Sequence, residues 1–324
     1  MSRRAPQLCI ATVIALSAAA AYAQGSYPAK PVRIIVASSA GGPYDDVARA
    51  LAPRLTEAWG QTVIVENRPG AGGIIGATAA AKSPADGYTW FIANAASIAI
   101  NPSLRSDLPY QPQRDFTPVM LMMQSPMLLV VHPSLPARTV KDLVALAKAK
   151  PGRINYASAG VGNLQHLSME YLQSIAGMRM NHVPYKGAAP ALVDVIAGQV
   201  DLMFANIIGA APHTKAQRLR PVAVSSAQRS PLMPDVPPVA ESYPGFDVTA
   251  WMGWFGPTGT PRDVIEKVSR DLSQALTRAD MRERFAQQGA DVIAGSSRDL
   301  TERVRRETLL YGKLIEAAGI RSHE

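Results

Sequence analysis

Two segments of the chain share one order of features: a short apolar strand, a turn of small residues with glycine, and the start of a helix. The first passes from a strand at 32–37 through a turn at 38–42 into a helix expected over 45–59. The second passes from a strand at 154–157 through a turn at 158–163 into another helix. In open α/β sheets, ligands bind beyond the carboxyl ends of strands, beside helix N-termini. The two turns therefore predict two α/β lobes with a ligand cleft between them.

The rest of the chain alternates strands with helices, which is typical of a mostly parallel sheet flanked by helices. The 324 residues are enough for two such lobes, each with a buried core. Further strands are expected at 62–66, 88–93, 128–132, 180–183, 200–205, 221–225 and 251–256. Two helices, roughly 262–288 and 298–317, are expected to end the chain.

The N-terminus has the pattern of a secretory signal peptide. Arg3 and Arg4 precede an apolar run over 8–21, which ends in the small-x-small cleavage pattern of Ala21 and Ala23. We expect residues 1–23 to be removed and the mature protein to lie in the bacterial periplasm. Cys9, the only cysteine, falls within this segment, so no disulfide is expected in the mature chain.

The formal net charge is +8, but its distribution does not favour a nucleic-acid partner. Lysines and arginines are scattered along the chain and are not interleaved with aromatic residues. A basic stripe would be needed to follow a phosphate backbone. We therefore interpret the charge as a solvated basic surface and expect no nucleic-acid binding.

The first turn consists of Ser38, Ser39, Ala40, Gly41 and Gly42, and its chemistry suits a carboxylate. It lacks the lysine of a P-loop and the third glycine of a dinucleotide-binding turn. Paired glycines let the backbone approach a ligand closely, and the free N–H groups of a helix's first turn can face it. Each charge-assisted hydrogen bond contributes about 1.5–3 kcal/mol. A few from each lobe reach the about 8 kcal/mol of micromolar binding.

Two acids follow this turn, and each has more than one interpretation. Asp45 is either an ordinary acid in the first turn of a helix, a brace that accepts the N–H groups of the turn, or a partner for a ligand ammonium. Asp46 beside it is expected to be solvated. Both would repel a phosphate group.

The second turn resembles a hydrolase nucleophile site, but the context is wrong. Ser158 lacks the preceding glycine of the G-x-S-x-G pattern, and His166 lies inside the following helix, where a packing or helix-bonding role is expected. No two histidines have H-x-x-x-H spacing, and cysteine ligands are absent from the mature chain. A secreted hydrolase that uses Ser158 and His166 is therefore a minor hypothesis, and no metal or cofactor is expected.

With both turns considered, the chain resembles the extracytoplasmic solute-binding proteins of tripartite tricarboxylate transporters, the Bug-type receptors. The resemblance covers nearly the whole chain after the signal peptide. It rests on a series of short motifs in order, at 41–45 with 48–49, 67–73, 86–89, 108–110, 115–119, 150–152, 156–160 with 166–167, 182–187 and 232–237. Single turns of this kind are weak signals, whereas so many in one order are a strong one.

The resemblance implies a two-lobed clamshell of the type II periplasmic binding protein kind, with mixed, mostly parallel sheets flanked by helices and two connecting strands. Residues 24–126 would form the first part of lobe 1, 127–248 lobe 2, and 249–324 the return and the C-terminal helices that complete lobe 1. Ligand contacts would come from the first turn with Asp45 shaping it. The other implied ligand contacts are Asn94, Ser97, Ser158, Gly160, Gly162, Asn163 and Asn206.

The sequence departs from the family's usual pattern at four positions. Ala40 stands where proline is usual, and Tyr44 is bulkier than the common small or hydroxyl residue. Asn163 stands where serine is frequent, and Ala205 replaces an acid. These departures are consistent with an unusual carboxylate or with a pocket partly filled by Tyr44.

The implied function is a monomeric receptor that closes on a small carboxylate, a di- or tricarboxylate or a related organic acid. It would deliver this solute to the membrane subunits of a tripartite tricarboxylate-type transporter, without catalysis. An alternative from a different class is a ligand-binding partner of a membrane signalling kinase. The same fold serves both functions, and loss of uptake on deletion would distinguish them.

Overall fold

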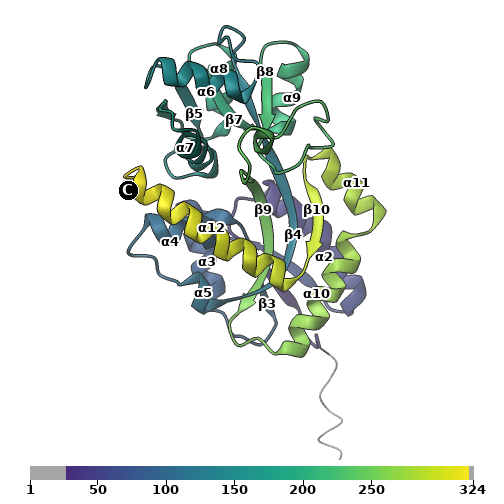
Figure 1. Ribbon diagram of the computed structural model, residues 1–324. Helices are drawn as coiled ribbons and strands as arrows, with labels where there is room; N and C mark the ends of the chain where they lie inside the picture. Colours follow the sequence, from purple (N-terminus) through teal and green to yellow (C-terminus); the bar gives the residue numbers. More distant parts are fainter. Residues whose placement is uncertain (1–26, 321–324) are drawn as a thin grey trace, which may run out of the picture.

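Two long strands, β4 (Phe116–Val131) and β9 (Thr249–Pro257), run between two lobes in the computed structural model of the protein, which describes residues 27–320 (Figure 1). The expected signal peptide at 1–23 lies outside the described residues. We call lobe 1 the part that contains both the first strand and the C-terminal helix, and lobe 2 the part inserted between β4 and β9. Figure 1 shows lobe 2 above lobe 1, with β4 and β9 side by side between them.

The strands form one ten-stranded sheet in the order β2-β1-β3-β9-β4-β7-β5-β6, and both β8 and β10 also pair with β4. Lobe 1 contributes β1 (Val32–Val36), β2 (Val63–Asn67), β3 (Thr89–Ala93) and β10 (Asp291–Gly295). Lobe 2 contributes β5 (Asn155–Ser158), β6 (Asn181–Pro184), β7 (Leu202–Asn206) and β8 (Arg220–Val224). Within each lobe the outer strands are parallel, whereas β4 pairs antiparallel with β7, β8, β9 and β10.

Strand β4 changes partner midway along its length. Its pairing with β9 ends where Pro126 faces Thr249, and its pairing with β7 begins where Met127 faces Asn206. Ser225 joins the strands at this point, because its hydroxyl accepts the N–H of Met127 at 2.8 Å and donates to the carbonyl of Val248. The chain therefore passes between the lobes at two adjacent, hydrogen-bonded crossings.

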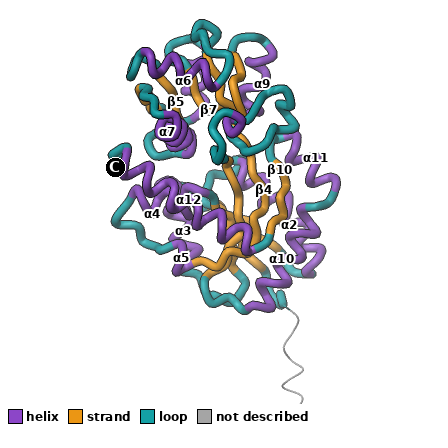
Figure 2. The backbone as a smooth tube through the Cα atoms, in the orientation of Figure 1, coloured by secondary structure: helices purple, strands orange, loops and turns teal. Residues whose placement is uncertain are grey.

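Helices cover the outer faces of the strands in both lobes (Figure 2). The helices of lobe 1 are α2 (Pro43–Trp59), η1 (Ala71–Gly73), α3 (Ile74–Ala81), η2 (Ala96–Ile100), α4 (Asn101–Leu104), α5 (Pro112–Asp115), α10 (Arg262–Leu276), α11 (Ala279–Gln287) and α12 (Ser297–Ala317). Those of lobe 2 are α6 (Val140–Ala149), α7 (Leu164–Ala176), α8 (Ala188–Ile196), α9 (Ile207–Lys215) and η3 (Val239–Glu241). Among the described helices, none has the length and apolarity needed to cross a membrane.

Amphipathic helices build a core on each face of each lobe. In α2, Val47, Leu51 and Leu55 recur at helical spacing and are buried, and together with α10 they cover one face of the lobe 1 strands. Helix α12, with η2 and α3, covers the opposite face. Lobe 2 repeats this arrangement, with α6 and α7 on one side and α8 and α9 on the other. Apolar burial of this kind is the main favourable term in folding.

Several element boundaries differ from the sequence-based expectation. Helix α2 begins at Pro43 rather than at Asp45, because proline suits the first helical position, where its missing N–H has no partner to lose. The expected strand at 128–132 is the end of the much longer β4, which tolerates Pro118 and Pro126. The single helix expected over 262–288 was wrong, since α10 and α11 are separate. Strand β10, which pairs with β4, was not expected.

The lobes also touch away from the crossings. A Cβ atom at Gly289, after α11, would lie 3.0 Å from Ile208 Cγ1 and 3.4 Å from Leu232 Cδ1 of lobe 2. On the other side, a Cβ at Gly162 would lie 2.7 Å from Leu104 Cδ1 of lobe 1. The lobes therefore meet on both flanks of the crossing strands.

Candidate ligand-binding cleft

A cavity of about 640 Å³ lies between the lobes, against the crossing strands. Lobe 1 contributes the first turn and the start of α2, and lobe 2 contributes the start of α9. Met123 and Ser125 of β4 and Met252 of β9 line it from the crossings. Residues from the end of α11 onward close a further side. A concave site of this volume between two lobes is the usual place for a small-molecule ligand.

Asp45 is the brace of the first turn. Its Oδ2 accepts the N–H of Gly41 at 2.8 Å and faces Arg49 Nε at 2.9 Å, and its Oδ1 accepts from Asn67 Nδ2 at 2.9 Å. Burial alone would raise the pKa of Asp45, but the hydrogen bonds from Arg49, Gly41 and Asn67 together hold this pKa below its usual value. Both carboxylate oxygens are thus occupied within the protein, which fits the bracing interpretation and not contact with a ligand ammonium.

The N-terminus of α2 keeps donors available at the edge of the cavity. Its N-cap residue, Gly42, provides no side-chain cap, and Pro43 has no N–H. Within the described part of the chain, the N–H groups of Tyr44 and Asp45 have no hydrogen-bond partner. These donors, together with the positive end of the helix dipole, form an environment that favours an anion.

Tyr44 packs against the lobe 1 core and does not line the cavity. Its side chain is within reach of the Asn94 amide, and burial raises the pKa of its hydroxyl. Asn94 in turn holds the start of η2, since its Oδ1 accepts the N–H of Ser97 at 3.1 Å. The Ser97 side chain is buried and hydrogen-bonds back to Asn94. Asn94 and Ser97 therefore stabilise local backbone and do not line the cavity.

The second turn is held by internal bonds. Ser158 is fully buried, and its hydroxyl donates to the carbonyl of Gly160 at 3.0 Å. Gly162 donates its N–H to His166 Nδ1 at 3.0 Å. Gly160 and Gly162 both have positive φ, which glycine adopts without strain. Asn163 caps α7 by accepting the N–H of His166, and its amide Nδ2 is buried with no partner among the described residues.

The structure gives Ser158 a different partner from the one considered in the hydrolase hypothesis. Ser158 Oγ lies 2.7 Å from His182 Nε2, while His166 stacks on His182 with ring centroids 3.8 Å apart. Burial lowers the pKa of His166 to about 3 and that of His182 to about 4, and the neighbouring His182 contributes to the shift of His166. His166 thus has the packing and helix-bonding role expected of it. A buried serine with no access to substrate gives no support to nucleophilic catalysis.

The structure brings only some of the expected ligand contacts to the cavity. Gly41, Gly42, Asp45 and Asn206 line it, and Ser38, Ser39 and Ala40 precede them in the same turn. Asn206 caps α9, with its Oδ1 accepting the N–H of Ile208 at 2.9 Å. The nine remaining expected contacts do not line this cavity: Ser38, Ser39, Ala40, Asn94, Ser97, Ser158, Gly160, Gly162 and Asn163. Contact with a ligand stays a prediction for all thirteen residues.

Sequence reasoning missed the residues that come from the crossings and from α11. Met123, Ser125 and Met252 lie on strands whose apolar pattern gave no sign of a ligand site. Phe285 and Gln288 belong to a segment that was expected to be a plain helix. The described residues also contain no cluster of three His, Cys, Asp or Glu side chains that would hold a metal ion.

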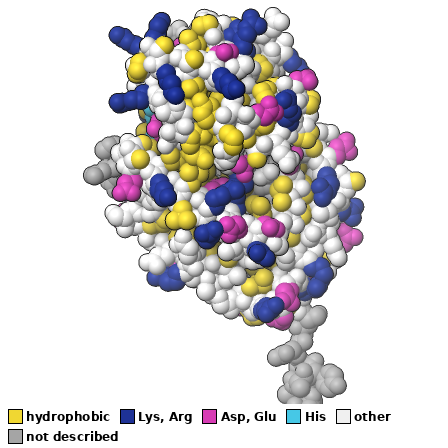
Figure 3. Space-filling model, in the orientation of Figure 1, with side chains coloured by type: hydrophobic (Ala, Val, Ile, Leu, Met, Phe, Trp, Pro, Cys, Tyr) yellow, Lys and Arg dark blue, Asp and Glu magenta, His cyan; other side chains and the backbone are white. Residues whose placement is uncertain are grey.

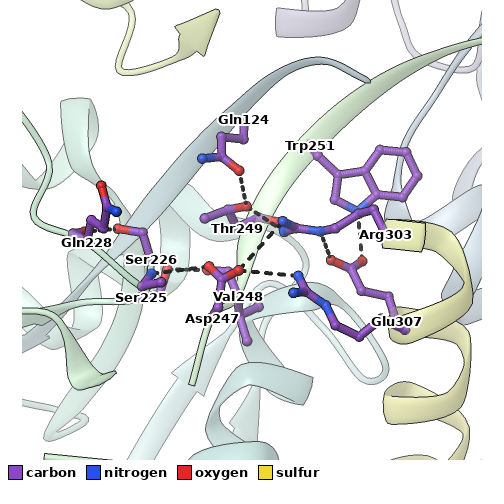
Figure 4. A network of polar contacts seen from close by, with 12 residues as sticks. Gln124, Ser225, Ser226, Gln228, Asp247, Val248, Thr249, Trp251, Arg303 and Glu307 are labelled. Carbon is purple, nitrogen blue, oxygen red and sulfur yellow. Dashed lines mark hydrogen bonds and ion pairs between the residues drawn. The ribbon is translucent and has the colours of Figure 1, made fainter. Parts of the chain in front are cut away.

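A polar network joins α12 to the second crossing (Figure 4). Arg303 contacts Glu307 on its own helix and donates to Thr249 Oγ1, and Trp251 Nε1 donates to Glu307 at 2.7 Å. Asp247, just before β9, lies 3.8 Å from Arg303 Nη1. On the face shown in Figure 3, acidic and basic side chains are interspersed over lobe 1. Basic side chains predominate over the upper part of lobe 2 on that face (Figure 3).

Comparison with known proteins gives one consistent result. The model of the "Tripartite tricarboxylate transporter family receptor" matches residues 47–320. Protein BugT of Bordetella pertussis is 38% identical, over 85% of each chain. The structure of R. palustris Rpa4515 with adipate is 34% identical with a TM-score of 0.75, and the match covers 91% of this chain and 99% of that one. MatC from Rhodopseudomonas palustris with bound malate is 31% identical with a TM-score of 0.72, over 89% and 100%.

Proposed function

Because the chain belongs to the family of tripartite tricarboxylate transporter receptors, we propose that it is a periplasmic receptor that captures a small carboxylate between its lobes and delivers it to a membrane transporter of that type. The family model describes transporter receptors, and we propose that this chain likewise has no catalytic activity. Two structural relatives hold adipate and malate, both of which are carboxylates. These relatives support the ligand class proposed for this chain.

The observation that carries the proposal is the uncapped N-terminus of α2 at the edge of the interlobe cavity. α7 and α9 are capped by the asparagines Asn163 and Asn206, which leaves fewer of their N–H groups for a ligand. At α2 the N-cap residue is Gly42, which has no side chain to cap the helix. The Asp45 carboxylate accepts the N–H of Gly41 and leaves the free N–H groups at the start of α2 available to a ligand. A ligand carboxylate would accept hydrogen bonds from the free N–H groups at the start of α2.

The proposed mechanism is closure of the two lobes, 24–126 with 249–324 and 127–248, about the crossings at Ser225. A ligand shifts such an equilibrium only if it binds the closed arrangement better than the open one. Contacts from both lobes to one solute satisfy this condition. Catalysis has no part in the mechanism, and the receptor works as a monomer.

The test is native mass spectrometry of protein purified from a periplasmic extract, followed by a thermal-shift panel of carboxylates with their amides as controls. We expect a retained or stabilising carboxylate and no effect from the matched amides. Stabilisation only by neutral or cationic solutes would contradict the proposal. Deleting the receptor should then abolish uptake of the identified acid. Intact uptake with a lost transcriptional response would favour the sensor function instead.

A further inference from the structure

The interlobe cavity has an apolar floor. Val47, Met123, Phe285 and Ala290 are all buried members of the lobe 1 core, and Met252 packs against them. The cavity therefore lies directly on the outer surface of that core. Methionine side chains adapt their shape to a bound apolar group and make favourable contacts with aromatic rings.

The basic side chains at the cavity, Arg49 and Arg284, each form an ion pair with an acidic side chain. Arg49 is the one basic residue among the described residues that line it, and its guanidinium contacts Asp45 and Asn67. Arg284, just outside the cavity, contacts Asp46, the second of the two acids at the start of α2. Asp46 also accepts from Gln288 Nε2 at 2.9 Å. The lining thus offers no uncompensated positive charge.

The remaining polar groups of the lining are neutral. They are the hydroxyl of Ser125 and the amides of Asn206, Gln287 and Gln288. A second carboxylate placed there would lose its hydration and would meet neither a cation nor a second uncapped helix N-terminus, since Asn206 caps α9. Such a loss of hydration is unfavourable for a charged group. An apolar body would instead bury its surface against the floor.

We propose that this receptor selects a monocarboxylate with an apolar body, aliphatic or aromatic, over a dicarboxylate of the same length. The carboxylate binds at the uncapped start of α2, and the body lies against the partly exposed Met252 and Ile208, above the buried Met123 and Phe285. This inference rests on the proposed function and narrows its ligand class. It distinguishes this chain from the relatives that hold adipate and malate.

The direct test compares hexanoate, adipate and hexanamide by isothermal titration calorimetry on the mature protein. We expect hexanoate to bind at least tenfold more tightly than adipate, and benzoate to exceed terephthalate in the same way. Adipate binding as tightly as hexanoate overturns the inference and leaves the proposed function intact. Hexanamide binding as tightly as hexanoate contradicts the proposed function itself. If neither hexanoate nor benzoate binds, the inference is overturned. The native mass spectrum still tests the proposed function in that case, because it detects any other carboxylate that the protein retains.

A designed change of specificity tests the location. Ile208 lines the cavity and is 40% exposed, so Ile208→Lys adds a cation to the lining without burying it. We expect the ratio of the hexanoate Kd to the adipate Kd to be at least tenfold higher in Ile208→Lys than in the neutral control Ile208→Gln. Val193→Lys adds the same charge on α8, outside the cavity, and should keep the wild-type ratio. An unchanged ratio in Ile208→Lys overturns the inference.

Discussion

Arg303 Nη2 donates a hydrogen bond of 2.6 Å to Thr249 Oγ1, and this bond ties the C-terminal helix to the residue where the second crossing begins. Arg303 is buried, as is its ion-pair partner Glu307. Glu307 also accepts from Trp251, which lies on β9. Helix α12 is thereby fixed to the strand that links the lobes.

Removing one member of this buried pair should destabilise the protein strongly. In Arg303→Leu, Glu307 stays buried without its cation, which costs about 3–5 kcal/mol of unfolding free energy. Burial already raises the pKa of Glu307, and Arg303 opposes that rise. The double variant Arg303→Leu/Glu307→Leu should recover much of the loss in urea unfolding. Equal stability of the single and double variants would contradict this account.

Replacing each of the two adjacent acids at the start of α2, Asp45 and Asp46, should change the stability of the protein by different amounts. Asp45→Asn weakens three hydrogen bonds at a buried site, and we expect a loss of about 1–3 kcal/mol in urea unfolding. The matched control Asp46→Asn alters a more exposed ion pair with Arg284, for which about 0–1 kcal/mol is typical. A larger effect of the control would show that Asp45 does not brace the turn.

Gly42→Val should abolish carboxylate binding and leave the fold intact. Gly42 has a negative φ that other residues adopt without strain. The backbone atom nearest to a new Cβ at this position would be the carbonyl oxygen of Ser39, at 3.3 Å. A branched side chain there would shield the first-turn N–H groups of α2 from a ligand. Circular dichroism checks the fold, and calorimetry checks the affinity. Unchanged affinity would remove this turn from the site.

Gly289→Ala should weaken ligand binding by opposing closure of the lobes. A Cβ at this position would crowd Ile208 across the cleft, as described above. Gly245→Ala is the matched control, because its φ of 90° resembles the 77° of Gly289 but its Cβ would meet nothing within 4 Å. We expect a larger radius of gyration by X-ray scattering and a higher Kd only in Gly289→Ala. If both variants changed the Kd and the radius of gyration equally, the effect would come from backbone strain at positive φ and not from contact with Ile208.

Acid should destabilise the fold through the stacked histidines. His166 and His182 have pKa values of about 3 and about 4, below the usual 6.5, because burial disfavours the charged rings. Between these values and pH 6.5 the unfolded chain binds more protons than the folded one, so the free energy of unfolding falls as pH falls. From pH 6.5 to 4.5 the expected loss is on the order of 2–4 kcal/mol.

Urea unfolding from pH 7 to pH 4.5 measures this dependence. His182→Gln keeps a polar group near Ser158 but cannot titrate, and it should flatten the decline. His213→Gln serves as the control for loss of a histidine outside the stack. A decline that is as steep in His182→Gln as in the wild type would assign the acid sensitivity to other groups.

The local features of the chain could be predicted from its sequence because they depend on neighbouring residues. Asn163 ends the second turn where α7 begins, as expected, whereas α2 begins at Pro43, ahead of the expected start at Asp45. The periodicity of Val47, Leu51 and Leu55 identifies the buried face of α2. These signals predicted the two turns, the alternation of strands and helices, and, through the resemblance, the family.

Only the tertiary structure decided which side chains meet. The parallel register of β5 and β6 sets Tyr156 opposite His182, which brings His182 to Ser158 although His166 is nearer in sequence. The floor of the cleft likewise joins Met123 of β4, Met252 of β9 and Phe285 of α11. Their meeting depends on strand pairing and helix packing between segments distant in the chain. No local pattern encodes such pairings, so the lining of the cavity could not be read from the sequence.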